Sequence, residues 1–79
     1  MVGYEEALSI ARGCCAEVDY VTELPGAFVF SKRDDMSFGG NGPVVVLKED
    51  GRAVNYVSFE MDGPDMAVVR EGYIAGFGA

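Results

Sequence analysis

The stretch FGGNGPVVVLKEDGRAVNYVSF, residues 38–59, decides the fold expected for this chain. An unbroken apolar run at 44–47 leads to Asp50-Gly51, and a second run rich in β-forming residues follows through Val54, Tyr56 and Val57. Asp-Gly supplies the positive φ angles that a two-residue hairpin turn needs, because the twist of the turn must match that of its strands. The stretch therefore predicts an antiparallel hairpin.

The first strand of this hairpin is apolar on both of its faces. Val44 and Val46 alternate with Val45 and Leu47, so each pair points to one side of the sheet. A strand of this kind is expected to be covered on both sides. We expect a helix on one side and a loop or a partner chain on the other.

A helix and two strands are expected before the hairpin. Residues 4–18 carry apolar side chains at three- and four-residue steps, which is typical of an amphipathic helix. Residues 18–24 and 27–32 are expected strands, joined at Pro25-Gly26 by a type II turn in which glycine takes a positive φ. Of the two faces of the second strand, the one bearing Phe28 and Phe30 is expected in the core.

The segment after the hairpin is ambiguous. Residues 60–64 predict a turn, because glycine and proline follow acidic residues there. The spacing of Met66, Val69 and Tyr73 supports a helix, whereas the β-branched Val68 beside Val69 supports a strand. Helix and strand both remain open for this segment.

Together these elements predict one α+β domain over residues 1–79. The N-terminal helix packs on a four-stranded antiparallel meander, and a short helix or strand ends the chain. A helix across one face of such a sheet is a cystatin-like arrangement. The analogy carries no function with it, and the QxVxG-type hairpin of true cystatins is absent.

Acidic residues outnumber basic ones by 13 to 6, which gives a net charge of −7. Nucleic acids and anionic membranes recruit lysine and arginine, so this balance argues against both as partners. A basic protein partner, or simply good solubility, accounts for the acidic excess. A homodimer would help so small a domain to bury more apolar surface.

The cytoplasm is the expected compartment. The chain opens without the basic start and apolar core of a signal peptide, and no window approaches the roughly 18 apolar residues of a membrane span. The only two cysteines, Cys14 and Cys15, are adjacent. Neighbouring residues of a helix point in different directions, so we expect reduced thiols rather than a disulfide.

Catalytic chemistry has little support in the composition. The chain has no histidine, which removes Ser-His and Cys-His pairs and the commonest metal ligand. Acidic residues gather at 34–35 and at 60–65, and paired carboxylates can do acid–base work or hold a hard cation. With 13 acidic residues in 79, chance clustering is expected. We therefore expect no catalytic residue, no metal site and no cofactor.

The same two acidic loops form the expected partner-binding surface. Their carboxylates would steer a basic partner, and the apolar side chains among them would supply the desolvated centre of the interface. The residues of this expected surface are Asp34, Asp35, Met36, Phe38, Glu60, Met61, Asp62 and Asp65.

The order of motifs resembles the bacterial immunity protein 35 family, which includes the YrhB-like small proteins. The matching features are the Tyr4-led helix, the aromatic strand 28–30, the loop 40–43, the apolar strand 44–47, the Asp50-Gly51 turn and the segment around Tyr73-Ile74. They span nearly the whole chain.

The resemblance implies an antidote in a bacterial polymorphic toxin system. Such a protein binds and blocks a cognate toxin made by the same cell, and a nuclease-type toxin would present a basic patch to it. The YrhB-like members imply a chaperone role as the alternative. A small oligomeric structural protein without enzymatic activity belongs to the same alternative.

Overall fold

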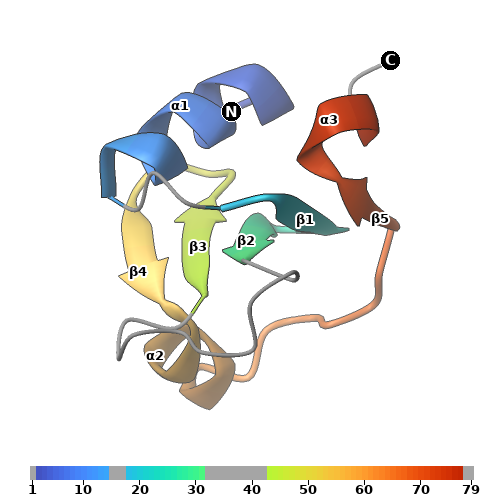
Figure 1. Ribbon diagram of the computed structural model, residues 1–79. Coiled ribbons are helices and arrows are strands. Elements are labelled where there is room, and N and C mark those ends of the chain that lie inside the picture. Colours follow the sequence, from blue (N-terminus) through green and yellow to red (C-terminus); the bar gives the residue numbers. More distant parts are fainter. Residues whose placement is uncertain (1, 15–17, 32–42, 78–79) are drawn as a thin grey trace.

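The computed structural model describes residues 2–14, 18–31 and 43–77 of the chain. These residues form an N-terminal helix, a five-stranded antiparallel sheet and two short helices (Figure 1). The elements are α1 (Tyr4–Cys14), β1 (Tyr20–Leu24), β2 (Ala27–Ser31), β3 (Val44–Leu47), β4 (Ala53–Asn55), α2 (Tyr56–Met61), β5 (Arg70–Tyr73) and α3 (Ile74–Phe77). The α+β class is confirmed.

The strands lie in the order β4-β3-β2-β1-β5. Four of them form the predicted meander, and β5 adds to its end by pairing antiparallel with β1. The prediction of four strands is therefore wrong by one. The segment for which helix and strand were both open forms one of each, because Arg70–Tyr73 extends along β1 as β5 and Ile74–Phe77 turns into α3. The β-branched Val68 and Val69 precede the strand.

Helix α1 is shorter than the periodicity predicts, since it ends at Cys14 and Val18 is not helical. Glu5 and Glu6 occupy its first turn, where carboxylates meet the positive end of the helix dipole. Ala7 and Ala11 are fully buried against the sheet, and their small side chains allow close packing. Val18 contributes to the same core from the chain leading into β1.

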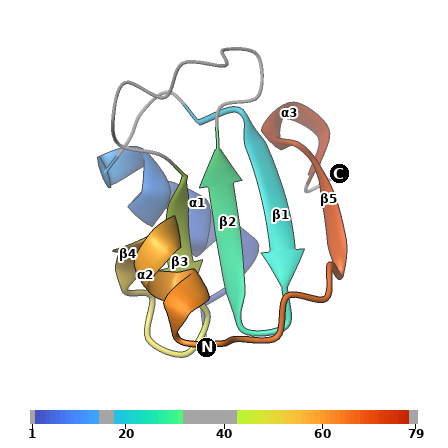
Figure 2. The same cartoon turned by 90° about the horizontal axis from the view of Figure 1, so that it is seen from below.

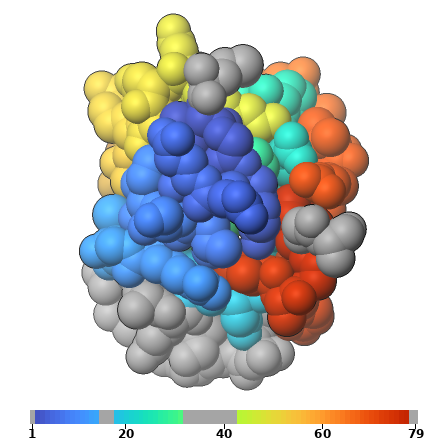
Figure 3. All heavy atoms as spheres, turned by 90° about the horizontal axis from the view of Figure 1, so that it is seen from above, coloured from blue at the N-terminus to red at the C-terminus, as the bar shows by residue number. Residues whose placement is uncertain are grey.

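One apolar layer lies between the sheet and the pair α1 and α3, which cover this face side by side (Figure 3). Phe28 and Phe30 point into this layer, so the prediction for this face of β2 is confirmed. The ring of Tyr4 lies 4.7 Å from that of Phe77, which joins the first helix to the last. The buried members are Ala7, Ala11, Val18, Val21, Phe28, Phe30, Val46 and Phe77.

A second apolar layer lies on the opposite face, under α2 (Figure 2). Its buried members are Leu24, Ala27, Val29, Val45 and Phe59. Cover on both faces of β3 is thus confirmed. Among the described residues, the cover on the second face comes from α2, a helix that the sequence predicts as strand.

The β3–β4 hairpin has a longer loop than the two-residue turn that Asp-Gly predicts. Leu47 donates its N–H to the carbonyl of Arg52 (3.0 Å), and Gly51 donates its N–H to the carbonyl of Leu47 (2.8 Å), so four residues form the loop. Of these, only Gly51 has a positive φ, 75°. The carbonyl of Lys48 accepts the N–H of Val2 (2.8 Å), and this contact with the N-terminal segment holds the wider loop.

The β1–β2 turn also differs from prediction. Leu24 pairs with Ala27, so Pro25 and Gly26 form a two-residue turn, but Gly26 does not have the positive φ of a type II turn. Its carbonyl accepts the N–H of Lys48 at 2.9 Å. A tertiary hydrogen bond therefore accompanies a turn conformation that the Pro-Gly pair alone does not predict.

In the ranges that the structure describes, no helix combines the length and the apolar composition that a bilayer crossing requires.

Candidate protein-binding surface

Helix α2 begins where the sequence predicts continued strand. Asn55 has an extended backbone, and its Oδ1 accepts the N–H of Ser58 at 2.7 Å, which is the hydrogen bond of a helix N-cap. Tyr56 and Phe59 turn inward to the second apolar layer. The strand predicted through Tyr56 and Val57 is therefore wrong, because the cap and the burial of Phe59 outweigh the β-propensity of the run.

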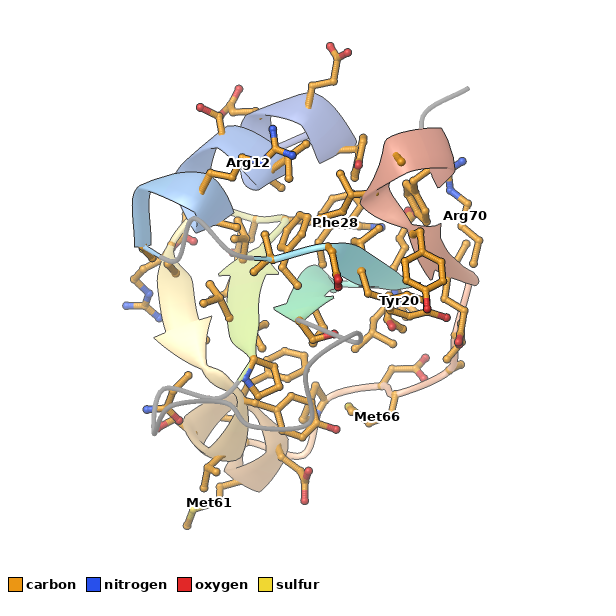
Figure 4. All side chains as sticks on the ribbon, in the orientation of Figure 1. Arg12, Tyr20, Phe28, Met61, Met66 and Arg70 are labelled. Carbon is orange, nitrogen blue, oxygen red and sulfur yellow. The ribbon has the colours of Figure 1, made fainter. Side chains whose placement is uncertain are left out.

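The outer side of α2 presents two apolar side chains to solvent. Val57 is 68% exposed and Met61 is 82% exposed. They are four residues apart, so one helical turn places them on the same side. Met61 points away from the rest of the molecule (Figure 4). This apolar pair has no structural role in the described core.

The connection from α2 to β5 is ordered by local hydrogen bonds. Asp62 ends the helix, and Gly63 follows with φ 69° and donates its N–H to the carbonyl of Glu60 (3.1 Å). Asp65 Oδ1 accepts the N–H of Ala67 (3.0 Å), which is an Asx turn. The turn predicted over residues 60–64 therefore begins later than expected, because Glu60 and Met61 are the last residues of α2.

Three further apolar residues are exposed along this connection, Met66, Val68 and Val69. Met66 lies on the chain between α2 and β5 (Figure 4). Val69 donates its N–H to the carbonyl of Glu23 (2.8 Å), so the connection is tied to β1 just before β5 begins. The exposed valines therefore stand on backbone that is held to the sheet.

Carboxylates accompany these apolar side chains. Glu60, Asp62 and Asp65 are all exposed, and no lysine or arginine occurs between Arg52 and Arg70. Within the described ranges, none of the three carboxylates forms an ion pair. The local potential is therefore negative and available to a partner.

We call this feature the α2–β5 surface. It combines exposed apolar side chains with uncompensated acidic ones, a composition that marks interaction sites on small soluble domains. Its residues are Val57, Glu60, Met61, Asp62, Asp65, Met66, Val68 and Val69.

The structure brings part of the expected partner-binding set together. Glu60, Met61, Asp62 and Asp65 all belong to the α2–β5 surface, although the first two lie in a helix rather than in a turn. The other expected residues lie outside the described part of the chain. These are Asp34, Asp35, Met36 and Phe38.

Sequence reasoning missed the remaining apolar members of this surface. Val57 was assigned to a strand, and Val68 and Val69 to an undecided element. One signal was present for Val57, since asparagine is a preferred N-cap residue and Asn55 stands directly before Tyr56. A helix beginning there places Val57 and Met61 on one side. The exposure of Val68 and Val69 has no comparable signal.

An ion cluster around Glu23 fixes the start of β5. Lys48 Nζ lies 2.7 Å from one carboxylate oxygen of Glu23, and Arg70 Nε lies 3.0 Å from the other. The hydrogen bond from Lys48 is the main reason that the pKa of Glu23 lies below its ordinary value. The guanidinium of Arg70 also stacks 4.2 Å over the ring of Phe77. One carboxylate thus links β1, the β3–β4 loop and β5.

The other end of β5 is fixed by tyrosines. Tyr20 donates its hydroxyl proton to Glu71 Oε1 at 2.6 Å. The rings of Tyr20 and Tyr73 meet edge to face with centroids 5.2 Å apart. Both contacts cross from β1 to β5, so β5 is anchored at each end while much of Tyr73 remains exposed.

Open grooves lie at both outer strands of the described sheet. The groove at β5, about 370 Å³, lies between that strand and α3. The groove at β4, about 210 Å³, is lined by Cys14, Pro43, Val44 and the residues of β4. Within the described residues, no group of three or more His, Cys, Asp and Glu side chains is placed to hold a metal ion. Both grooves suit a peptide or a side chain by their position.

Comparison with family models, with curated proteins and with solved structures gave no match to this chain.

Proposed function

We propose that this chain is an immunity protein that binds and neutralises a cognate bacterial toxin by protein–protein contact, without catalysis. The observation that carries the proposal is the α2–β5 surface. Its most exposed apolar side chain, Met61 at 82%, stands between two acidic residues, Glu60 and Asp62. The order of motifs that resembles the immunity protein 35 family supports the same function.

The acidic members of the surface would steer a basic target. Opposite potentials speed the encounter of two proteins, and added salt screens that steering. A nuclease-type toxin needs cationic side chains to hold phosphate, so its active face would meet Glu60, Asp62 and Asp65. An inhibitor docked on that face would block access of nucleic acid.

The apolar members would supply most of the binding energy. Interfaces gain affinity from a few side chains that are fully desolvated in the complex, surrounded by a polar rim. Val57 and Met61 can fill this role because burial in the protein's own core does not occupy them. Methionine is flexible and polarisable, so Met61 adapts its shape to a partner pocket.

We also propose that part of the fold follows the cystatin-like arrangement. That part is α1, which lies across the meander β1–β4. Helix α2 on the opposite face and β5 at the end of the sheet are additions to that plan.

A chaperone of the YrhB type, or a small oligomeric protein such as a homodimer, is the second candidate. Exposed Met61 and Met66 favour it, because methionine-rich surfaces suit unrelated apolar clients. The two candidates differ in the number of partners that they accept. A chaperone would suppress the heat-induced aggregation of unrelated proteins, whereas an immunity protein would not.

Co-expression tests the immunity function directly. The toxin domain encoded beside this gene would be induced in a bacterial host with and without the chain. Rescue of growth, together with a complex that survives gel filtration, is expected. Suppressed aggregation of unrelated clients without rescue would favour the chaperone.

Charge reversal tests the surface itself. Glu60→Lys with Asp62→Lys is expected to slow association with the toxin about tenfold at low salt and to change dissociation less. The matched control, Glu6→Lys with Glu49→Lys, makes the same change in net charge at exposed positions away from the α2–β5 surface. Equal slowing by both pairs would show that net charge, rather than this surface, steers the toxin.

A further inference from the structure

Strand β5 forms an open edge of the described sheet. It pairs with β1 on one side, and in the described residues no strand lies on its other side. Ile74 donates its N–H to the carbonyl of Asp19 (2.8 Å), and an antiparallel ladder bonds to its neighbour at every second residue. Tyr73 therefore lies at the alternate position, where its N–H points away from β1, while its C=O precedes α3 and accepts the first hydrogen bond of that helix.

The groove beside β5 contains a hollow built from glycines. Its lining residues are Arg70, Glu71, Gly72, Tyr73, Gly76 and Phe77. A Cβ atom on Gly72 would meet nothing closer than Phe77 Cδ1 at 3.9 Å, and one on Gly76 would meet nothing within 4 Å. A side chain from an added strand would therefore find space beside Gly72, under α3.

The protection of this sheet edge consists of the short length and the charged residues of β5. Proteins guard edge strands by keeping them very short, with charged side chains, proline or bulges, or with a covering element. In β5 the guanidinium of Arg70 contacts Glu23 and Phe77, so this charge is not free to extend over the outer side of the strand. Val69 and Tyr73 are 58% and 51% exposed at the two ends of the strand. The edge therefore offers main-chain bonding groups flanked by apolar contacts.

The charge of the chain just before β5 indicates which kind of partner would bind at this sheet edge. From residue 60 to residue 69, just before β5, the chain carries Glu60, Asp62 and Asp65 and no lysine or arginine. A second copy of this chain would bring a further −7 to the same place. A cationic segment gains from the same field, so charge complementarity favours it over self-association.

We propose that β5 accepts an extended cationic segment of the protein partner as an added strand. The main-chain bond donated by the Tyr73 N–H gives affinity, and one apolar side chain of the segment enters the hollow beside Gly72 and Gly76. The inference rests on the proposed function, in that it describes how the partner of an inhibitory protein docks. It extends the α2–β5 surface onto the sheet edge.

A synthetic peptide tests the edge without a known partner. The probe is acetyl-Lys-Phe-Lys-Val-Lys-Phe-Lys-amide, and its control is the same peptide with every backbone nitrogen of its seven residues methylated, so that neither edge of the control can pair. Both carry the same charge, but only the probe can donate backbone N–H groups to β5. The probe is expected to bind at least about tenfold more tightly, equivalent to about 1.4 kcal/mol. It should also slow hydrogen exchange at the Tyr73 amide. Equal binding of both peptides would overturn the inference.

Substitutions of Tyr73 in β5 test the inference independently of the control peptide. Tyr73→Pro removes the outward N–H without removing a bond to β1, and proline is tolerated at such edge positions. Tyr73→Thr is the matched control, because it also loses the ring but keeps the N–H. The proline variant is expected to bind the probe up to about tenfold more weakly than the threonine variant, the loss of one hydrogen bond. If both bind alike, the inference fails. If the proline variant does not fold, the methylated peptide decides alone.

Binding of the cognate toxin distinguishes a failure of strand addition at β5 from a failure of the proposed immunity function. A toxin that binds wild type and both Tyr73 variants equally would refute strand addition and leave the immunity function intact. Failure of the toxin to bind any of the three proteins, while the peptide still binds the β5 edge, would refute the immunity function alone.

Discussion

Replacing Gly51 with alanine is expected to destabilise the protein by about 2 kcal/mol. Gly51 has φ 75°, a conformation that costs an L-residue about 1–2 kcal/mol. An added Cβ would also lie 2.9 Å from Val2 Cγ2 and 3.3 Å from Ile10 Cδ1. Relief of that contact requires Val2 to move, which strains its hydrogen bond to the Lys48 carbonyl (2.8 Å). Valine in place of Gly51 should cost more, because a β-branched residue tolerates positive φ least.

Urea denaturation at neutral pH measures this change, with Gly26→Ala as the control. Gly26 has no positive φ, and a Cβ there would meet nothing within 4 Å. Alanine at Gly26 is therefore expected to be neutral or stabilising by up to about 1 kcal/mol. In a thermal melt, the Gly51 variant should lose about 8–16 °C, the shift that 2 kcal/mol produces in a domain of this size.

A double-mutant cycle separates backbone strain from crowding. Val2→Ala removes the methyl group that an added Cβ at Gly51 would strike. If crowding contributes, the two substitutions together should cost less than the sum of their separate costs, by about 0.5 kcal/mol or more. Equal stability of the Gly51→Ala and Gly26→Ala proteins would refute both causes and the described loop geometry.

Two other stability predictions follow from the contacts of single side chains. The pKa of Glu23 is lowered from 4.5, so its stabilising effect is complete above that pH and is lost as the pH falls through the folded value. Glu23→Gln should therefore show a smaller acid-induced loss of stability than wild type in urea titrations below pH 4.5, and an identical slope would contradict the ion cluster. Asn55→Ala should cost about 1 kcal/mol through the lost N-cap, whereas Ser58→Ala, whose side chain plays no part in that bond, should cost less.

The predictable part of this fold rests on alternation in β2 and β3. Phe28 and Phe30 face one layer because strand side chains alternate, and the apolar residues of β3 on both faces require two layers. Helix α2 was missed because Tyr56, Val57 and Phe59 all favour strands. Their helix depends on the Asn55 cap and on a buried site for Phe59 that only the assembled sheet provides.

The turns and the candidate surface show the same limit. Pro25-Gly26 fits a type II turn by its residues, but Gly26 takes a different conformation while bonding to Lys48, which is distant in sequence. The acidic part of the candidate surface was predictable because charged residues in connections stay exposed. The exposure of Val57, Val68 and Val69 was not predictable, because the sequence does not indicate which of its apolar residues will lie outside the core.

Lys48 connects three parts of the chain that are far apart in sequence. Its N–H bonds to Gly26, its carbonyl accepts from Val2, and its ammonium group holds Glu23, which in turn holds Arg70 of β5. Opening of this one loop would release the N-terminal segment and would remove the support that Lys48 gives to the β1–β2 turn and to Glu23 beside Arg70. The amides of Val2 and Lys48 should then exchange with solvent in a single cooperative event, although neither lies in a regular element. A partner bound to β5 would slow the exchange of these two amides, although neither amide lies in that strand.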